Sequence, residues 1–220
     1  MSAPVFEVIR SWLPTGARRI CLLTNDEPSS AALTFAAEVA VDVLHGATAD
    51  AAIDSGYDLL IVADGVPDVA ALGVIAAYTR KDASRVMPLM DDDAEWMALA
   101  GAVRDRIREL RPHLVEFDHI LAGEDMTNIS AMHTMMTTAA RRSVPVLFNG
   151  VGACAAALIT DRYLYTARET MLCADALGLP SVAESLDRIG IPALATFEIP
   201  DAHLGALLAV PILRAAALTS

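Results

Sequence analysis

The sequence has few cysteines and a deficit of positive charge, and these shortages argue against several classes of function. Three cysteines in 220 residues form no Cys-x-x-Cys pair and have no histidine at metal-ligand spacing, so we expect buried, reduced thiols. Lysine and arginine number 16 against 28 aspartates and glutamates, which is a formal net charge of −12. Because binding to a phosphate backbone needs a basic surface, we expect no nucleic-acid partner.

Long apolar runs and targeting patterns are also missing. Hydrophobic residues make up 55% of the chain and mean hydropathy is +0.44, yet no uninterrupted apolar run approaches the ~20 residues that span a bilayer. The first residues have neither the basic start nor the apolar segment of a signal peptide. We therefore expect a cytoplasmic protein with no membrane partner. The surplus of apolar surface favours a homodimer, with a hetero-oligomer as the alternative.

Common catalytic signatures do not occur in the chain. There is no GxGxxG, P-loop, GxSxG or HExxH motif, so the usual nucleotide, hydrolase and zinc sites are not indicated. The one run of acidic residues, 91–93, suits the start of a helix, where carboxylates complement the dipole, better than a metal site. We expect neither a metal nor a cofactor, and the site must be sought in loops at strand ends.

Short apolar segments alternate with helical segments along the whole chain. This order predicts a single α/β domain over 1–220, with a doubly wound, mostly parallel sheet flanked by helices, as in Rossmann-like folds. Segment 58–63 is the clearest central strand, because it is apolar on both faces. Other expected strands are 19–24, 41–44, 144–148 and 193–199, with briefer ones at 85–89, 119–122 and 163–165. Expected helices are 5–13, 31–40, 47–55, 69–79, 94–110, 129–142, 153–159, 168–177, 182–189 and 204–218.

Polar residues follow several of the predicted strands and precede helices. They are Asp64, Asp68, Glu124, Asp125, Asn128, Asn149, Asp201 and His203. Ligands of open parallel sheets bind at the carboxyl ends of the strands. We therefore expect these side chains to gather in one cleft and to bind a ligand there.

Each of these positions also has a structural interpretation. An aspartate or asparagine beside a glycine suits a turn, as at Asp64 and Asn149. Three of the residues suit the N-cap of the helix that follows: Asp68, Asn128 and Asp201. A lone histidine such as His203 more often makes a structural hydrogen bond than a catalytic one. Both interpretations stay open at this point.

Three segments match one enzyme family in order and spacing. Residues 57–65 resemble a strand that leads into a GEMGIGNTT loop. Residues 128–150 and 155–158 are similar to the family's IAAM…AAxxRVPVLLDGF…AAAL segment, and residues 205–216 to its closing GAALALPLLRAA helix. In these three segments the chain resembles the nicotinate-nucleotide:dimethylbenzimidazole phosphoribosyltransferase family of cobamide lower-ligand synthesis. The resemblance covers roughly residues 45–220, and members are usually much longer.

The resemblance implies that the chain corresponds to the large domain of that family. It also implies the transfer of phosphoribose from nicotinate mononucleotide to a ring nitrogen of an aromatic base. In the family a glutamate acts as general base, and glycine-rich loops hold the phosphate. The glutamate falls on Ala202 here, with Asp201 as the only neighbouring carboxylate, and an aspartate of the family becomes Asn149. The phosphate loops fall on 66–71 and 87–90, which contain no glycine.

Three functions follow from these similarities and differences. The first is a divergent phosphoribosyltransferase in which Asp201 replaces the missing base, with a pKa that burial must raise for work near neutral pH. The second is a non-catalytic subunit or sensor that binds a small aromatic or nucleotide-like ligand. The third is a different reaction in the same cleft that uses Asp64, Glu124, Asp125 or Asp201 as acid or base.

Overall fold

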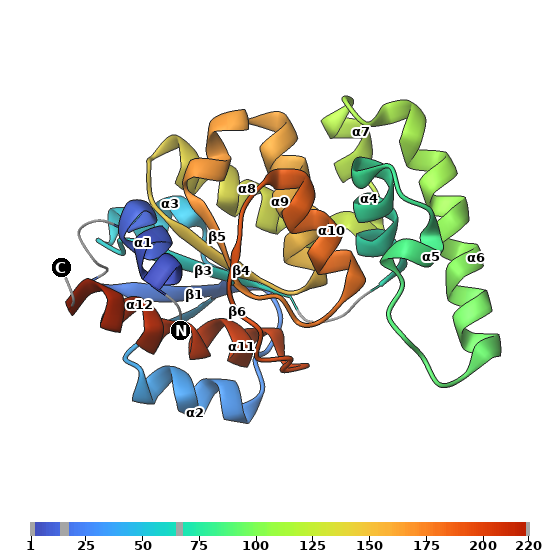
Figure 1. Cartoon of the computed structure of the whole chain (residues 1–220). Helices are drawn as coiled ribbons and strands as arrows, with labels where there is room; N and C mark the ends of the chain where they lie inside the picture. The colour runs from blue at the N-terminus through green and yellow to red at the C-terminus, as the bar shows by residue number, and fades with distance from the viewer. Residues whose placement is uncertain (1–2, 14–17, 65–67, 219–220) are drawn as a thin grey trace.

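The computed structural model of the chain describes residues 3–13, 18–64 and 68–218. Six strands in these ranges form one sheet in the order β2-β1-β3-β4-β5-β6, and every pairing is parallel (Figure 1). The strands are β1 (Ile20–Thr24), β2 (Asp42–His45), β3 (Leu59–Ala63), β4 (Val146–Asn149), β5 (Met171–Asp175) and β6 (Ala193–Ala195). The predicted doubly wound, parallel α/β fold is confirmed.

Helices cover both faces of the sheet, and each face has its own apolar core. Cys21, Leu60 and Val62 belong to one core, whereas Leu22 and Ile61 belong to the other. Successive residues of a strand point to opposite faces, so a strand covered on both sides is apolar throughout. The first layer contains α3 (Ala49–Asp54), α8 (Thr127–Arg141), α9 (Val151–Tyr163) and α10 (Pro180–Ile189). The opposite layer contains α1 (Ala3–Trp12), α2 (Ser30–Glu38), α11 (Ala202–Leu208) and α12 (Val210–Leu218) (Figure 1).

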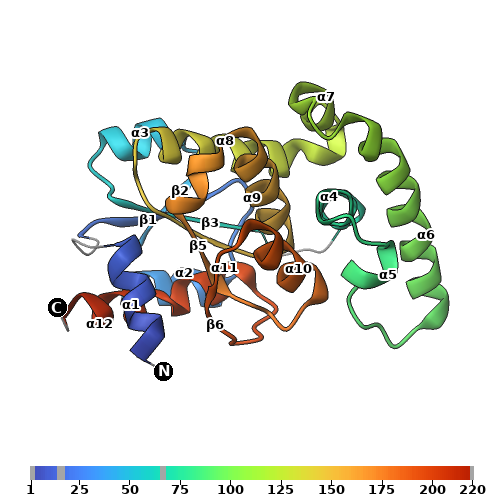
Figure 2. The same ribbon diagram turned by 45° about the horizontal axis from the view of Figure 1, so that its top comes forward.

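A further group of helices packs beside the first layer rather than on the sheet. In α4 (Val69–Thr79) every residue from Ala70 to Thr79 is buried, because α9, α10 and α6 (Asp93–Leu110) all contact it. Figure 2 shows α4 end-on between α6 and the rest of the molecule. The other elements of this group are α5 (Ala83–Val86), η1 (Arg111–His113), α7 (Phe117–Leu121) and η2 (Glu124–Met126). Asp92 caps α6, so the predicted role of the acidic run at a helix start is confirmed.

One strand replaces a predicted helix. The sequence predicts a helix over 168–177, because its alanine, leucine and methionine residues favour helices. Instead, Met171 to Asp175 form β5, which pairs with β4 and is buried along its length. A central position between two layers of helices therefore overrides local helix propensity. The expected strand over 193–199 is shorter than predicted, since β6 ends at Ala195.

The three brief strands of the prediction do not form, and helices overlap each segment. Segment 85–89 overlaps α5, 119–122 overlaps α7, and 163–165 joins the end of α9 to η3 (Tyr165–Glu169). Short apolar runs do not distinguish strands from buried helical turns. The final helix is also divided, because α11 ends at Leu208 and α12 begins at Val210.

Two smaller observations concern membranes and thiols. In the described ranges no helix combines the length and apolarity that crossing a membrane requires. Cys21, Cys154 and Cys173 are free and buried, as the sequence predicts. The single domain over 1–220 and the homodimer stay predictions.

Candidate functional site

The candidate site lies at the carboxyl edge of the sheet. Thr24, Asn149 and Asp175 end β1, β4 and β5, and Asp64 directly follows β3. The register pairs Ala63 with Asn149, so β3 and β4 end side by side. The start of α11 packs on the same edge, where Asn149 bonds to its first residue. The edge therefore gathers polar side chains from segments far apart in the sequence.

Asn149 joins three elements at this edge. Its side chain is fully buried, its Nδ2 donates to the Ala202 carbonyl oxygen at 2.9 Å, and its Oδ1 accepts from the Asp175 backbone N–H at 3.2 Å. The amide thus uses a donor and an acceptor at once, which a carboxylate cannot do. Asn149 fixes the start of α11 relative to β4 and β5.

Asp175 is the residue of this edge that the sequence analysis missed. Its Oδ1 accepts from the backbone N–H groups of Leu177 at 3.0 Å and Phe197 at 2.8 Å. Its Oδ2 is buried and has no hydrogen-bond partner in the described part of the chain, which is an unfavourable position for an acceptor. The sequence pattern places Asp175 inside a predicted helix over 168–177, so it is not recognised there as a residue at a strand end. The signal that could have found it is a short apolar run closed by Asp175 and the turn at Gly178.

Asp201 and His203 also lie at this edge, and each is held by structural contacts. Asp201 caps α11, because its Oδ1 accepts from the Leu204 N–H at 3.0 Å, and its Oδ2 accepts from the Ser29 hydroxyl at 2.5 Å. The His203 Nε2 lies 3.2 Å from the Thr24 hydroxyl, and its Nδ1 lies 4.0 Å from Asp201 Oδ1. The capping interpretation of Asp201 and the structural hydrogen bond of His203 are both confirmed.

Neighbouring groups determine the protonation states of Asp201 and His203. Burial raises the pKa of Asp201, but hydrogen bonds from Ser29 and from the Leu204 N–H, with His203 nearby, bring it below its ordinary value. Burial lowers the pKa of His203, against the opposing effect of Asp201 and Asp26. At neutral pH Asp201 is therefore ionised and His203 neutral. The requirement for a raised Asp201 pKa is not met, and hydrogen bonding is the physical reason.

Asp64 packs against the first turn of α9. A Cβ placed on Gly152 would lie 2.0 Å from Asp64 Oδ2, and a Cβ on Gly150, whose φ is +99°, would lie 1.7 Å from the Asp64 carbonyl oxygen. Only glycine allows this approach. The N-terminus of a helix attracts negative charge, and Asp64 itself occupies that place in α9. A ligand phosphate at the same helix end would meet the Asp64 charge.

Asn128 approaches the edge from α8. Its Nδ2 donates to Asp26 Oδ2 at 3.4 Å, and Met126 rather than Asn128 is the N-cap of α8, so the capping interpretation of Asn128 is wrong. A hollow of about 10 Å³ lies between Asp26, Asp64 and Asn128, which has room for about one water molecule. In the described ranges no three histidine, cysteine, aspartate or glutamate side chains are grouped as metal ligands.

Three of the predicted site residues lie outside this cluster. Asp68 caps α4, because its Oδ1 accepts from the Ala71 N–H at 2.7 Å, as its structural interpretation predicts. Asp125 in η2 forms an ion pair with Arg106 of α6 at 3.1 Å. Glu124 is exposed beside it. The structure brings together Asp64, Asn128, Asn149, Asp201 and His203, and it does not bring Asp68, Glu124 or Asp125 to them.

Comparison with known proteins places the chain in a family. A family model described as phosphoribosyltransferase matches residues 14–220. The chain belongs to this phosphoribosyltransferase family. The nicotinate-nucleotide–dimethylbenzimidazole phosphoribosyltransferase of Streptomyces coelicolor is 34% identical over an alignment of 210 residues, with 92% of this chain and 56% of the relative covered. The enzyme of the same name from Mycobacterium tuberculosis is 31% identical over an alignment of 204 residues, with 88% of this chain and 52% of the relative covered.

The chain spans about half the length of these curated relatives, with 56% and 52% of them covered. A solved structure of CobT from Thermus thermophilus has a TM-score of 0.78 to this chain at 16% identity, covering 98% of this chain and 89% of that one. A second structure from that organism, described as nicotinate-nucleotide-dimethylbenzimidazole phosphoribosyltransferase, has a TM-score of 0.77. At this identity the likeness shows the fold alone. The family resemblance seen in the sequence is confirmed.

Proposed function

We propose that this chain transfers phosphoribose from nicotinate mononucleotide to a ring nitrogen of an aromatic base. Family membership over residues 14–220 is the observation that carries the proposal. Relatives named for this reaction, at 31–34% identity, add to it. Because the chain spans about half of those relatives, the activity is assigned here to the chain itself and is tested on it alone.

In the proposed step a ring nitrogen forms a bond to C1′ of the ribose. The C1′–N bond to nicotinate breaks, and nicotinate leaves with the bonding electrons. The attacking ring gains positive charge, and the proton on its second nitrogen passes to the Asp201 carboxylate. That positive charge acidifies the N–H, so a base of low pKa can accept the proton. The lowered pKa of Asp201 keeps the carboxylate ionised and ready at neutral pH.

The other residues of the edge bind or position in this proposal. We assign His203 and Asn128 to contacts with the ligand beside Asp201. Asn149 and Asp175 act as positioning residues, since their hydrogen bonds hold the start of α11 and the Phe197 backbone. The Asp201 cap and its bond from Ser29 then fix the direction of the carboxylate.

The test is turnover by the purified chain. It is incubated with nicotinate mononucleotide and 5,6-dimethylbenzimidazole, and released nicotinate is measured by chromatography. Asp201→Asn keeps a good N-cap residue but removes the proton acceptor, so we expect the rate to fall by about 100-fold or more. Asp187→Asn is the matched control, because Asp187 is exposed on α10, and its rate should equal that of the wild type.

The two possible failures are distinct. If the wild-type chain releases no nicotinate at high protein concentration, the transferase proposal is wrong. If Asp201→Asn releases nicotinate at the wild-type rate, the transfer stands and the role of Asp201 is wrong. The cytoplasmic location and the homodimer, or the alternative hetero-oligomer, accompany this proposal as predictions.

A further inference from the structure

A second pocket lies away from the carboxyl edge of the sheet, between α6 and α5. Its volume is about 350 Å³, within the range of sites for small molecules. The pocket is lined by residues of α5 and α6 and by Asp82 and Arg111, which flank these helices. It shares no lining residue with the carboxyl edge of the sheet, so the pocket and the edge are separate places.

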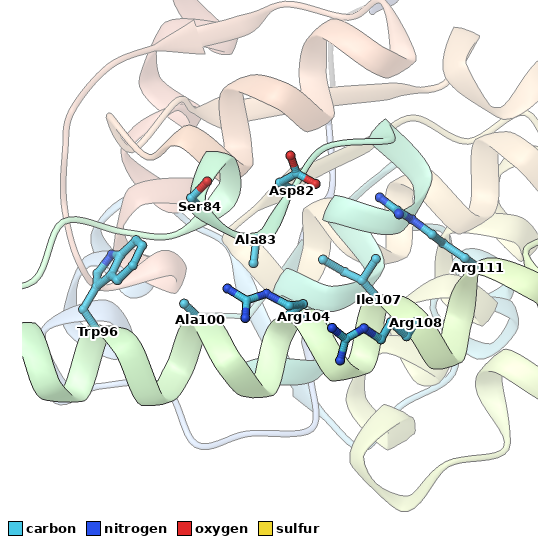
Figure 3. Close-up of a pocket in the computed structure, with 9 residues that line it drawn as sticks. All are labelled: Asp82, Ala83, Ser84, Trp96, Ala100, Arg104, Ile107, Arg108 and Arg111. Atoms are coloured by element: carbon cyan, nitrogen blue, oxygen red, sulfur yellow. The ribbon is translucent and has the colours of Figure 1, made fainter.

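One wall of the pocket is positively charged. Arg104, Arg108 and Arg111 line it. Arg104 and Arg108 are four residues apart and so share one side of α6, and Arg111 is the residue that follows this helix. Figure 3 shows the Arg104 and Arg108 side chains lying along α6, with Arg111 at one end of the pocket. Arg108 forms an ion pair with Asp105 at 2.6 Å. Within the described part of the chain, the one hydrogen bond of the Arg111 side chain is a long one of 3.4 Å to the Lys81 carbonyl oxygen.

Arg104 differs from its two neighbours. It has no hydrogen-bond or ion-pair partner among the described residues, although the chain carries 28 acidic residues and a net charge of −12. In such an acidic chain an arginine without a carboxylate partner, beside two further arginines, makes a local site for an anion. Guanidinium groups bind phosphate oxygens through paired, charge-assisted hydrogen bonds.

The rest of the pocket suits an aromatic ring and hydroxyl groups. Trp96 stands at the end opposite Arg111 (Figure 3), and Ala100 and Ile107 form an apolar floor. An indole face binds planar rings by stacking. Asp82 and Ser84 lie across the pocket from α6 (Figure 3), and the Asp82 side chain makes no capping hydrogen bond to α5. Its carboxylate oxygens are acceptors that match sugar hydroxyls.

We propose that this pocket binds a mononucleotide. The phosphate lies on Arg104, the base stacks on Trp96, and the ribose hydroxyls donate to Asp82. One ligand of this class uses the cationic, aromatic and acidic parts of the pocket together, whereas a bare anion uses only the first. The site is additional to the carboxyl edge, and it does not depend on turnover there.

Trp96 provides a direct reporter. The chain has two tryptophans, and the other, Trp12, lies on α1 in the opposite layer. In a Trp12→Phe variant, titration with adenosine 5′-monophosphate should quench the Trp96 fluorescence. Calorimetry on the unmodified chain should give the same dissociation constant. Inorganic phosphate should bind at least tenfold more weakly, because it cannot stack.

Two substitutions separate the pocket from general charge effects. Arg104→Gln should weaken binding of the nucleotide by about tenfold, the effect of losing one charge-assisted contact. Arg162→Gln is the matched control, because Arg162 is exposed on α9, and its affinity should stay within about twofold of the wild type. The absence of both quenching and heat at millimolar nucleotide overturns the proposal. Equal losses in the two variants, or phosphate binding as tight as nucleotide binding, also overturn it.

Discussion

Asn149 offers a sharp test of how the carboxyl edge is held together. Replacement by aspartate keeps the shape of the side chain and changes one donor, the Nδ2 group 2.9 Å from the Ala202 carbonyl oxygen, into an acceptor. The Oδ1 contact to the Asp175 N–H can persist. The substitution also introduces the aspartate that the family motif has at this position.

The expected destabilisation is large for a change of one group. Asn149 is fully buried, so the variant leaves the Ala202 carbonyl and the new oxygen without a donor, at about 1–3 kcal/mol each. Burial of the added charge increases the cost further. We expect a loss of about 3–6 kcal/mol at pH 7.5, against a typical total stability of about 5–15 kcal/mol.

The stability of the Asn149→Asp variant should change with pH in one direction. Burial without a donor favours the neutral form of the introduced carboxyl, so its folded-state pKa lies above the unfolded value of about 4. The folded state then binds more protons, and the variant loses stability as pH rises from about 4 towards the folded-state pKa. The protonated carboxyl can donate to Ala202, so the deficit should shrink on acidification.

Urea unfolding at pH 7.5 and pH 5, followed by circular dichroism, measures both effects. Asn25→Asp is the matched control, because Asn25 is exposed and the change adds the same charge. A deficit of less than about 1 kcal/mol for Asn149→Asp at pH 7.5, or one that widens at pH 5, would refute the reasoning.

Two further predictions concern the buried histidine and the glycines. Burial lowers the pKa of His133 to about 4, with a contribution from Arg141, so the folded state resists its protonation. Stability present above about pH 6.5 should therefore fall by roughly 3 kcal/mol as pH drops towards 4. Urea unfolding of His133→Gln should show a flatter decline, and an unchanged slope would contradict this. Gly152→Ala should lower the melting temperature, because its Cβ would lie 2.0 Å from Asp64 Oδ2. Gly101→Ala on α6 has nothing within 4 Å of its Cβ and should stabilise the protein by about 0.5–1 kcal/mol; equal shifts in both variants would exclude the close approach of Asp64.

The site can be predicted in part from the sequence. The pattern places Asn149 and Asp201 at a strand end and a helix start, and the shared edge follows from the topology of parallel sheets. The sequence alone cannot exclude Asp125 from the site, because its ion pair with Arg106 depends on how α6 packs beside η2. Asp175 was missed because the local sequence favours a helix, whereas the residue ends a strand.

The fold class can be predicted from the sequence alone. A segment such as 58–63 is apolar on both faces of a strand, and such a strand is stable where helices cover both faces of a parallel sheet. The family can be read in the same way, since three segments of the chain resemble family segments in the same order. Folding in three dimensions was needed to show that residues 171–175 pair with β4. It was also needed to show that hydrogen bonds from Ser29 and the Leu204 N–H lower the pKa of Asp201 against the effect of burial. Local propensity is a weak preference for each residue, whereas strand pairing and side-chain protonation depend on neighbours that the chain brings together only when it folds.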